Sequence, residues 1–290
     1  RILVYYSLHF KNTFMEKILY VTDAIKLNTR CLDFGVFVCN LTHSRLTGVF
    51  LENKEQEARS RQEIIETAVG NTLPGVSASA LKDHYCEENI RHFRNACETG
   101  GVNCAIHKDN GVPLAEVITE SRYADLIVID VTTSFTSVRE TTPTSFVKEV
   151  LQEAECPVII APERFDGVDE IIFTYDGSRS SVFAIKQFIH LFPQLGDKKV
   201  TILSVTHPGG KVKGDKYKLK EWLGSHYDHI ELVTLEDGNV RARLLEYLLV
   251  KEKVFVVMGA YGRGVLSNLL APSHAGTVVQ LLTQPVFKEA

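Results

Sequence analysis

Three glycines, Gly259, Gly262 and Gly264, lie directly after the apolar run 254–258 and before a segment of helical periodicity. Glycine accepts positive φ and lets a ligand approach the backbone closely. The first N–H groups of a following helix point outward at an anion. This order predicts either a phosphate-binding turn or an ordinary tight connection between a strand and a helix. Pro272-Ser273 follows, with nine residues between Gly262 and the proline.

The chain contains an internal repeat, which gives the glycines a context. Three segments of the first half recur in the second half: Lys17 to Asp23 matches Glu170 to Asp176, Ala124 to Asp130 matches Lys253 to Gly259, and Cys156 to Ile160 matches Gln284 to Phe287. The offsets show that the first copy has 24 additional residues between its first and fourth strands. We therefore expect two domains of one fold.

In each half, short β-branched runs alternate with helical periodicity, the pattern of a parallel sheet with helices on both faces. We expect strands near residues 17–22, 45–51, 102–107, 125–129 and 157–161, and again near 170–175, 199–205, 230–235, 253–258 and 285–288. A turn region with Pro162 and Gly167 predicts the boundary between domains 15–162 and 168–290. Residues 1–14 precede the first methionine and are expected to be extraneous to the first domain.

Composition restricts the functional class. The net charge of −4 argues against nucleic-acid and anionic-membrane surfaces, which need clustered cations. One basic run, 211–220, holds five lysines and is interpreted as a solvated loop or helix face. No apolar run reaches the length of a membrane span, and we expect a cytoplasmic protein. The six cysteines lack metal-ligand spacing and are expected to be reduced, mostly buried thiols, although a redox role for Cys86 or Cys97 stays open.

These residues together resemble the universal stress protein family in its tandem form, over residues 15–290. The family motif is Gly, two residues, Gly, nine residues, Gly, then Ser or Thr. Here it reads Gly259, Gly262 and Pro272-Ser273, with the third glycine replaced. Asp176-Gly177-Ser178 and Gly111-Val112-Pro113 also resemble family segments.

The resemblance implies two tandem five-stranded parallel-sheet sandwich domains of the adenine nucleotide α-hydrolase-like, Rossmann-like class. Family members often dimerise through their last strand. A tandem chain is expected to make that pairing internally, between 157–161 and 285–288, as an intramolecular pseudo-dimer; a homodimer is the alternative.

The resemblance also implies binding of ATP or a related adenine nucleotide, with or without Mg²⁺, in the C-terminal half. Carried over by position, the binding residues are Asp176, Val205, Gly259, Gly262, Arg263, Gly264 and Ser273. Pro272 has no N–H to donate, which weakens the expected phosphate site. Ser178 is interpreted equally well as a ligand contact or as a helix cap.

The first half departs further from the motif. Its equivalent positions are Asp130, Thr133 and Pro143-Thr144. A carboxylate at position 130 would repel phosphate, and Thr133 adds a Cβ where close approach is needed. Although Asp23 is retained, we expect this half to bind no nucleoside triphosphate and to serve as a structural or partner-facing copy.

No catalytic or metal-binding residues are predicted, because the ten histidines are scattered and no nucleophile elbow is present. Three functions remain: a non-catalytic ATP-binding stress-response protein, an interaction scaffold that binds no nucleotide, and a slow ATP-hydrolysing or adenylating enzyme. The absence of an SGGxDS-like loop after the first strand argues against adenylation. A protein partner is expected but unknown, and the polar segment 53–92 is its expected surface.

Overall fold

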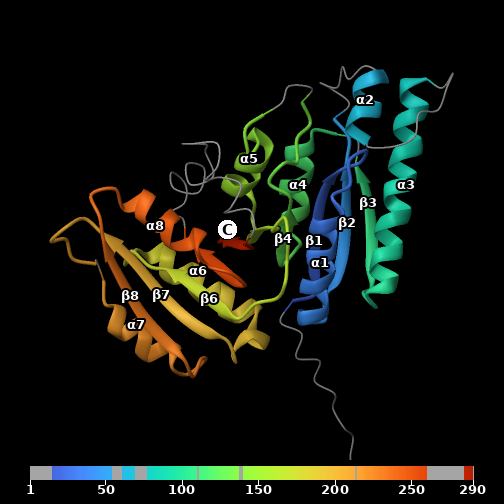
Figure 1. The fold of residues 1–290 in the computed structure, drawn as a ribbon. Coiled ribbons are helices and arrows are strands. Elements are labelled where there is room, and N and C mark those ends of the chain that lie inside the picture. Colours follow the sequence, from blue (N-terminus) through green and yellow to red (C-terminus); the bar gives the residue numbers. More distant parts are fainter. Residues whose placement is uncertain are drawn as a thin grey trace, which may run out of the picture.

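The computed structural model describes residues 15–53, 61–68, 77–109, 111–136, 140–212, 214–259 and 284–289. They form one ten-stranded sheet with helices on both faces (Figure 1), in the strand order β3-β2-β1-β4-β5-β10-β9-β6-β7-β8. The predicted α/β class with five strands in each half is confirmed.

The first half contributes one side of the sheet. Its strands are β1 (Lys17–Asp23), β2 (Arg45–Leu51), β3 (Cys104–Asp109), β4 (Leu126–Ile129) and β5 (Val158–Ile160), and they pair with one another in parallel. Its helices are α1 (Thr29–Thr42), α2 (Arg61–Ala68), α3 (Ala78–Thr99), α4 (Pro113–Ser121) and α5 (Ser145–Glu153). Each predicted strand is present within two residues of its expected limits.

The second half repeats this plan. Its strands are β6 (Glu170–Thr174), β7 (Lys199–Thr206), β8 (Ile230–Glu236), β9 (Val254–Met258) and β10 (Val286–Lys288), again paired in parallel within the half. The described helices are α6 (Arg179–Leu191), the short 3₁₀ helix η1 (Pro193–Leu195), α7 (Lys216–Leu223) and α8 (Val240–Leu249).

The two halves join through their last strands. β10 pairs with β5 antiparallel, with Val286 opposite Ile160 and Lys288 opposite Val158. This is the internal pairing that the resemblance predicted. It covers the edge that each five-stranded half would otherwise leave open.

The packing crosses this junction on both faces of the sheet. Alternate strand residues point to opposite faces, so Ile18 and Tyr20 belong to one core while Leu19 and Val21 belong to the other. Each core contains side chains from both halves. The Phe34 ring, for example, lies 5.0 Å from that of Phe165 in the connecting segment. Burying such a side chain contributes roughly 1.5–3 kcal/mol, and both halves share this stabilisation.

The additional residues of the first half lie between its second and third strands. Residues 52–103 connect β2 to β3 and contain α2 and the 22-residue α3, whereas residues 207–229 connect β7 to β8 and contain only the 8-residue α7 among described helices. The predicted partner surface falls largely on α2 and α3. The structure does not test that prediction.

The basic run 211–220 comprises a loop and part of α7. Lys211, Lys218 and Lys220 are exposed, as expected for a solvated face, while Lys216 Nζ donates to Thr234 Oγ1 at 2.8 Å. Across the described helices, none has both the length and the apolar character needed to cross a bilayer.

Candidate functional site

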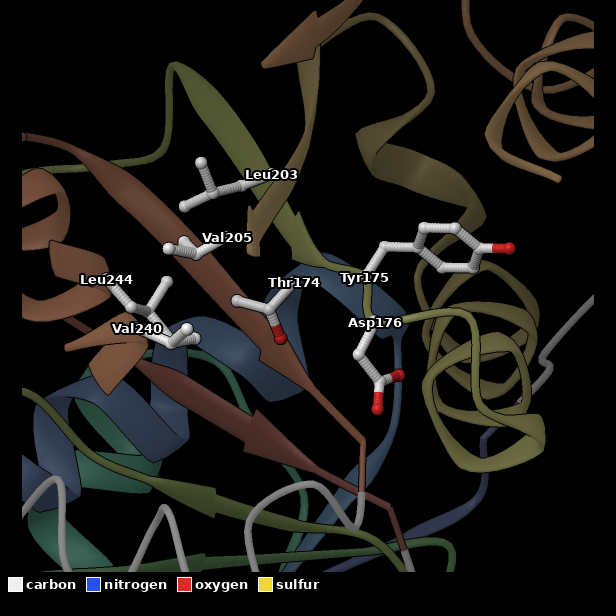
Figure 2. A pocket seen from close by; sticks show the side chains of 7 residues that line it. All are labelled: Thr174, Tyr175, Asp176, Leu203, Val205, Val240 and Leu244. Atoms are coloured by element: carbon white, nitrogen blue, oxygen red, sulfur yellow. The ribbon is translucent and has the colours of Figure 1, made fainter. Parts of the chain in front are cut away.

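A pocket opens at the carboxyl ends of β6 and β7, beside the start of α8 (Figure 2). Its empty space, with the adjoining open solvent included, is about 350 Å³. It is lined by Thr174, Tyr175, Asp176, Leu203, Val205, Val240 and Leu244. In parallel α/β sheets the crevice outside the carboxyl ends of the strands is the usual ligand position.

One wall of the pocket is apolar. Leu203 and Val205 come from β7, two residues apart on the same face of the strand, and Val240 and Leu244 come from successive turns of α8. These aliphatic side chains frame a surface suited to a flat, weakly polar ring. Val205 was expected at this position, whereas the two α8 residues were not. Their i, i+4 spacing after a strand marks an apolar helix face, which does not by itself distinguish a pocket from a core.

Asp176 supplies the charge at this pocket. Its Oδ1 accepts from the backbone N–H of Ser178 at 2.9 Å, and the turn is completed by Gly177 with φ of 81°. Ser178 in turn caps α6, accepting from Ser181 N at 3.1 Å. The structure therefore supports the capping interpretation of Ser178, and it places the carboxylate of Asp176 in the pocket lining.

Tyr175 adds a phenol beside Asp176. Burial is the main cause that raises the pKa of this hydroxyl, and the neighbouring carboxylates Asp215 and Asp176 raise it further. The group is therefore a neutral hydrogen-bonding side chain near neutral pH. Its position directly before Asp176 gave no separate sequence signal.

Gly259 lies at the end of β9, against the first turn of α6. A Cβ added there would lie 2.6 Å from Ser181 N and 2.7 Å from Ser180 C, which are backbone atoms that cannot move aside cheaply. Only glycine permits this contact. Because β6 lies between β9 and β7 in the sheet, Gly259, Asp176 and Val205 lie at the carboxyl ends of three adjacent strands.

The α6 N-terminus also meets the end of the chain. Ser180 Oγ donates to Glu289 Oε1, and Glu289 is only 4% exposed. A buried carboxylate thus lies near the helix terminus next to Gly259. The sequence comparison did not predict this residue.

Of the predicted set, Asp176 and Val205 line the pocket, and Gly259 follows β9, the strand next to β6. Four predicted residues, Gly262, Arg263, Gly264 and Ser273, lie outside the described residues, as does Pro272. Their roles stay predictions.

In the first half, the position equivalent to Gly259 holds Asp130, which carries a carboxylate. Asp130 Oδ1 accepts from Thr132 N at 2.5 Å, and Asp130 Oδ2 accepts from Asn28 Nδ2. Asn28 is the N-cap of α1. The side chain at this motif position is therefore held against the N-terminus of a helix.

A second carboxylate lies at the start of α5. Glu140 Oε1 accepts from Ser145 N at 3.0 Å, next to Thr144, the α5 N-cap. Burial acts to raise the pKa of Glu140, but hydrogen bonds from Ser134 and Ser145 outweigh it and lower this pKa overall. The first half thus has a carboxylate of its own at two helix N-termini, where negative charge is favourable.

Comparison of the sequence with protein families and with curated proteins finds no match. Comparison of the structure does. A universal stress protein from Archaeoglobus fulgidus aligns over 95% of this chain and 96% of its own, with a TM-score of 0.65 and 18% identity. The near-complete coverage of both chains includes both halves of the sheet.

The chain has the universal stress protein fold. A functionally unknown protein from Pseudomonas aeruginosa has a similar structure, with a TM-score of 0.52 and 14% identity over 95% of this chain and 92% of its own. A universal stress protein solved in complex with cAMP aligns with 52% of this chain and 99% of its own, at 15% identity and a TM-score of 0.35.

Proposed function

We propose that this chain is a universal stress protein that binds ATP or a related adenine nucleotide in its second half and performs no catalysis. The observation that carries the proposal is that Asp176 and Val205 line one pocket with an aliphatic wall, beside β9, the strand that precedes Gly259. Family resemblance alone had related these three positions.

Each part of the site suits one part of a nucleotide. The aliphatic wall formed by Val205, Val240 and Leu244 suits the adenine ring. Asp176 lies where its carboxylate can accept hydrogen bonds from ribose hydroxyls, and charged acceptors make the stronger bonds. Gly259 brings the end of β9 against the start of α6 with no side chain between them, and a helix N-terminus favours a phosphate.

The scaffold alternative rests on two observations. Pro272 removes one amide donor from the motif, and buried Glu289 places negative charge close to the start of α6. Both would weaken phosphate binding by loss of a donor or by like-charge repulsion. Domain limits of 15–162 and 168–290, a monomeric pseudo-dimer and a cytoplasmic location belong to the same proposal.

Calorimetric titration of the full chain with ATP and Mg²⁺ tests the proposal. We expect one site per chain, and loss of binding in Gly262→Val, whose side chain would stand where the backbone must approach the phosphates. Thr133→Val, at the equivalent position of the first half, is the matched control and should leave binding unchanged. No heat of binding at millimolar nucleotide would leave the scaffold function in its place. Release of ADP or pyrophosphate on prolonged incubation would instead favour an enzyme.

A further inference from the structure

A second cavity of the second half lies between β8 and the loop that leads into α7. Its volume is about 310 Å³, at the lower end of the range of small-molecule sites. The loop and α7 contribute Lys211, Asp215, Lys216 and Tyr217 to its lining, and β8 contributes Thr234. α7 packs on one face of the sheet, whereas α8, which borders the pocket of Figure 2, packs on the other. The two cavities are therefore separate.

The loop that forms this cavity is fixed by contacts with two strand ends. Gly209 N donates to Glu236 Oε2 at 3.3 Å, which ties the loop to the end of β8. Gly214 has a φ of 77°, and a Cβ added there would lie 2.5 Å from the Tyr175 hydroxyl oxygen and 3.1 Å from Gly177 Cα. Glycine alone accepts this conformation at such close approach. The lysines of the loop are thus carried by a backbone with defined contacts.

The lining of the cavity carries more positive than negative charge. Lys211 and Lys216 both line it, and neither forms an ion pair with a described carboxylate. Lys216 Nζ donates instead to the neutral Thr234 hydroxyl at 2.8 Å. Asp215 is the one acid among the described lining residues, and its Oδ1 accepts from two backbone N–H groups of α7 at 3.0 and 3.1 Å. The cavity thus has two cations and one carboxylate that is already hydrogen-bonded.

The first half shows what meets a cation at the equivalent place. Strand register relates Thr234 to Lys108. Lys108 Nζ lies 3.7 Å from Asp83 Oδ1 of α3 and 3.6 Å from Glu52 Oε1. α3 has 22 residues, whereas α7 has 8 and is preceded by the glycine- and lysine-rich loop. In the first half the chain itself supplies the anion, and in the second half the cavity is open to an anion from solution.

We propose that this cavity binds a small phosphorylated molecule, and that Lys211 and Lys216 hold its phosphate group. A phosphate has three strong acceptor oxygens, which match two ammonium groups and the Thr234 hydroxyl. Tyr217 offers an aromatic face to a planar part of the ligand. The inference does not depend on nucleotide binding in the pocket of Figure 2.

Calorimetric titration of the full chain with pyrophosphate, at constant ionic strength, tests the proposal. The double variant Lys211→Gln/Lys216→Gln should bind at least about tenfold more weakly, because two charge-assisted hydrogen bonds are lost. Lys218→Gln/Lys220→Gln is the matched control, since it removes the same charge from exposed positions of the same basic run outside the cavity. It should leave the affinity unchanged. Gly262→Val should also keep this binding, so the two proposals fail separately.

Covalent labelling decides the same question in the wild type. Pyridoxal phosphate condenses with a lysine amine to an imine with loss of water, and borohydride reduces the imine to a stable amine for peptide mapping. We expect label on Lys211 or Lys216, and pyrophosphate should prevent it there but not at Lys218 or Lys220. Equal pyrophosphate affinity in the two double variants, no binding at millimolar pyrophosphate, or labelling without protection at the cavity lysines would overturn the proposal.

Discussion

The two halves share one backbone plan, yet their carboxyl-end sites differ in access. Each of the seven residues that line the second-half pocket has an equivalent in the first half, assigned from strand register and helix position. These equivalents are Val21, Thr22, Asp23, Val49, Leu51, Pro113 and Val117. All seven are buried. In the second half Asp176, Val205 and Val240 reach solvent. A duplicated fold has therefore closed one copy of the site with side chains while the other keeps an open pocket.

The halves also differ in what lies at their helix N-termini. Asp130 and Glu140 place carboxylates at the starts of α1 and α5. At the position equivalent to Asp130 the second half has Gly259, which contacts the start of α6 through backbone alone. The first half therefore has a carboxylate at the motif position itself, whereas in the second half the carboxylate near the helix start belongs to Glu289, outside the motif. The predicted failure of this half to bind a nucleoside triphosphate gains a physical cause from this arrangement.

The largest effect is expected when a side chain is added at Gly259, where the backbone packs against α6. Gly259→Ala should lower the free energy of unfolding by about 1–3 kcal/mol, because the added Cβ overpacks against fixed backbone. Urea denaturation measures this change. Gly238→Ala is the matched control, since a Cβ added there meets nothing within 4 Å. Equal stability of the two variants would contradict the contact.

The next largest effect is expected to distinguish Asp176 from Asp23, its equivalent in the first half. Asp176→Asn keeps the acceptor for Ser178 N but removes the charge, and should weaken ATP binding about tenfold, since a hydrogen bond to a charged group contributes about 1.5–3 kcal/mol. Asp23→Asn should leave the affinity unchanged, because Asp23 is buried and its Oδ1 accepts from Ile25 N at 3.0 Å. Calorimetry of both variants decides. An equal loss of affinity would mean that the halves are not functionally distinct.

A smaller effect is expected for the internal carboxylate of the first half. Glu140→Gln should lower stability at pH 7 by roughly 0.5–1 kcal/mol, a value reduced by partial exposure. Because the folded pKa of Glu140 is lowered, its contribution is complete above the ordinary glutamate value of about 4.3 and is lost as pH falls through the folded value.

Urea denaturation of the wild type and Glu140→Gln across the acid range measures this dependence. The gap between the two proteins should narrow toward acid pH. A constant gap from pH 7 to acid pH would show that the charge of Glu140 is not what stabilises the start of α5.

Much of the fold followed from the sequence. The alternation of buried strands with helical periodicity located the ten strands, and the family resemblance predicted the pairing of the two last strands. Gly259 was found from the glycine spacing, and Asp176 and Val205 from the family resemblance. Val240, Leu244 and Tyr175 were missed, because nothing local distinguishes a pocket-lining aliphatic or aromatic residue from a core one.

By itself, the sequence determined the class of fold, its duplication, and the better preserved motif of the second half, because periodicity and spacing are local properties of the chain. Only the tertiary structure decided that the first-half site is closed and that Asp130 and Glu140 lie at helix N-termini. It alone placed Gly259 against α6. These facts depend on which side chains meet after long crossovers, and contacts between distant segments leave no periodic trace in a single sequence.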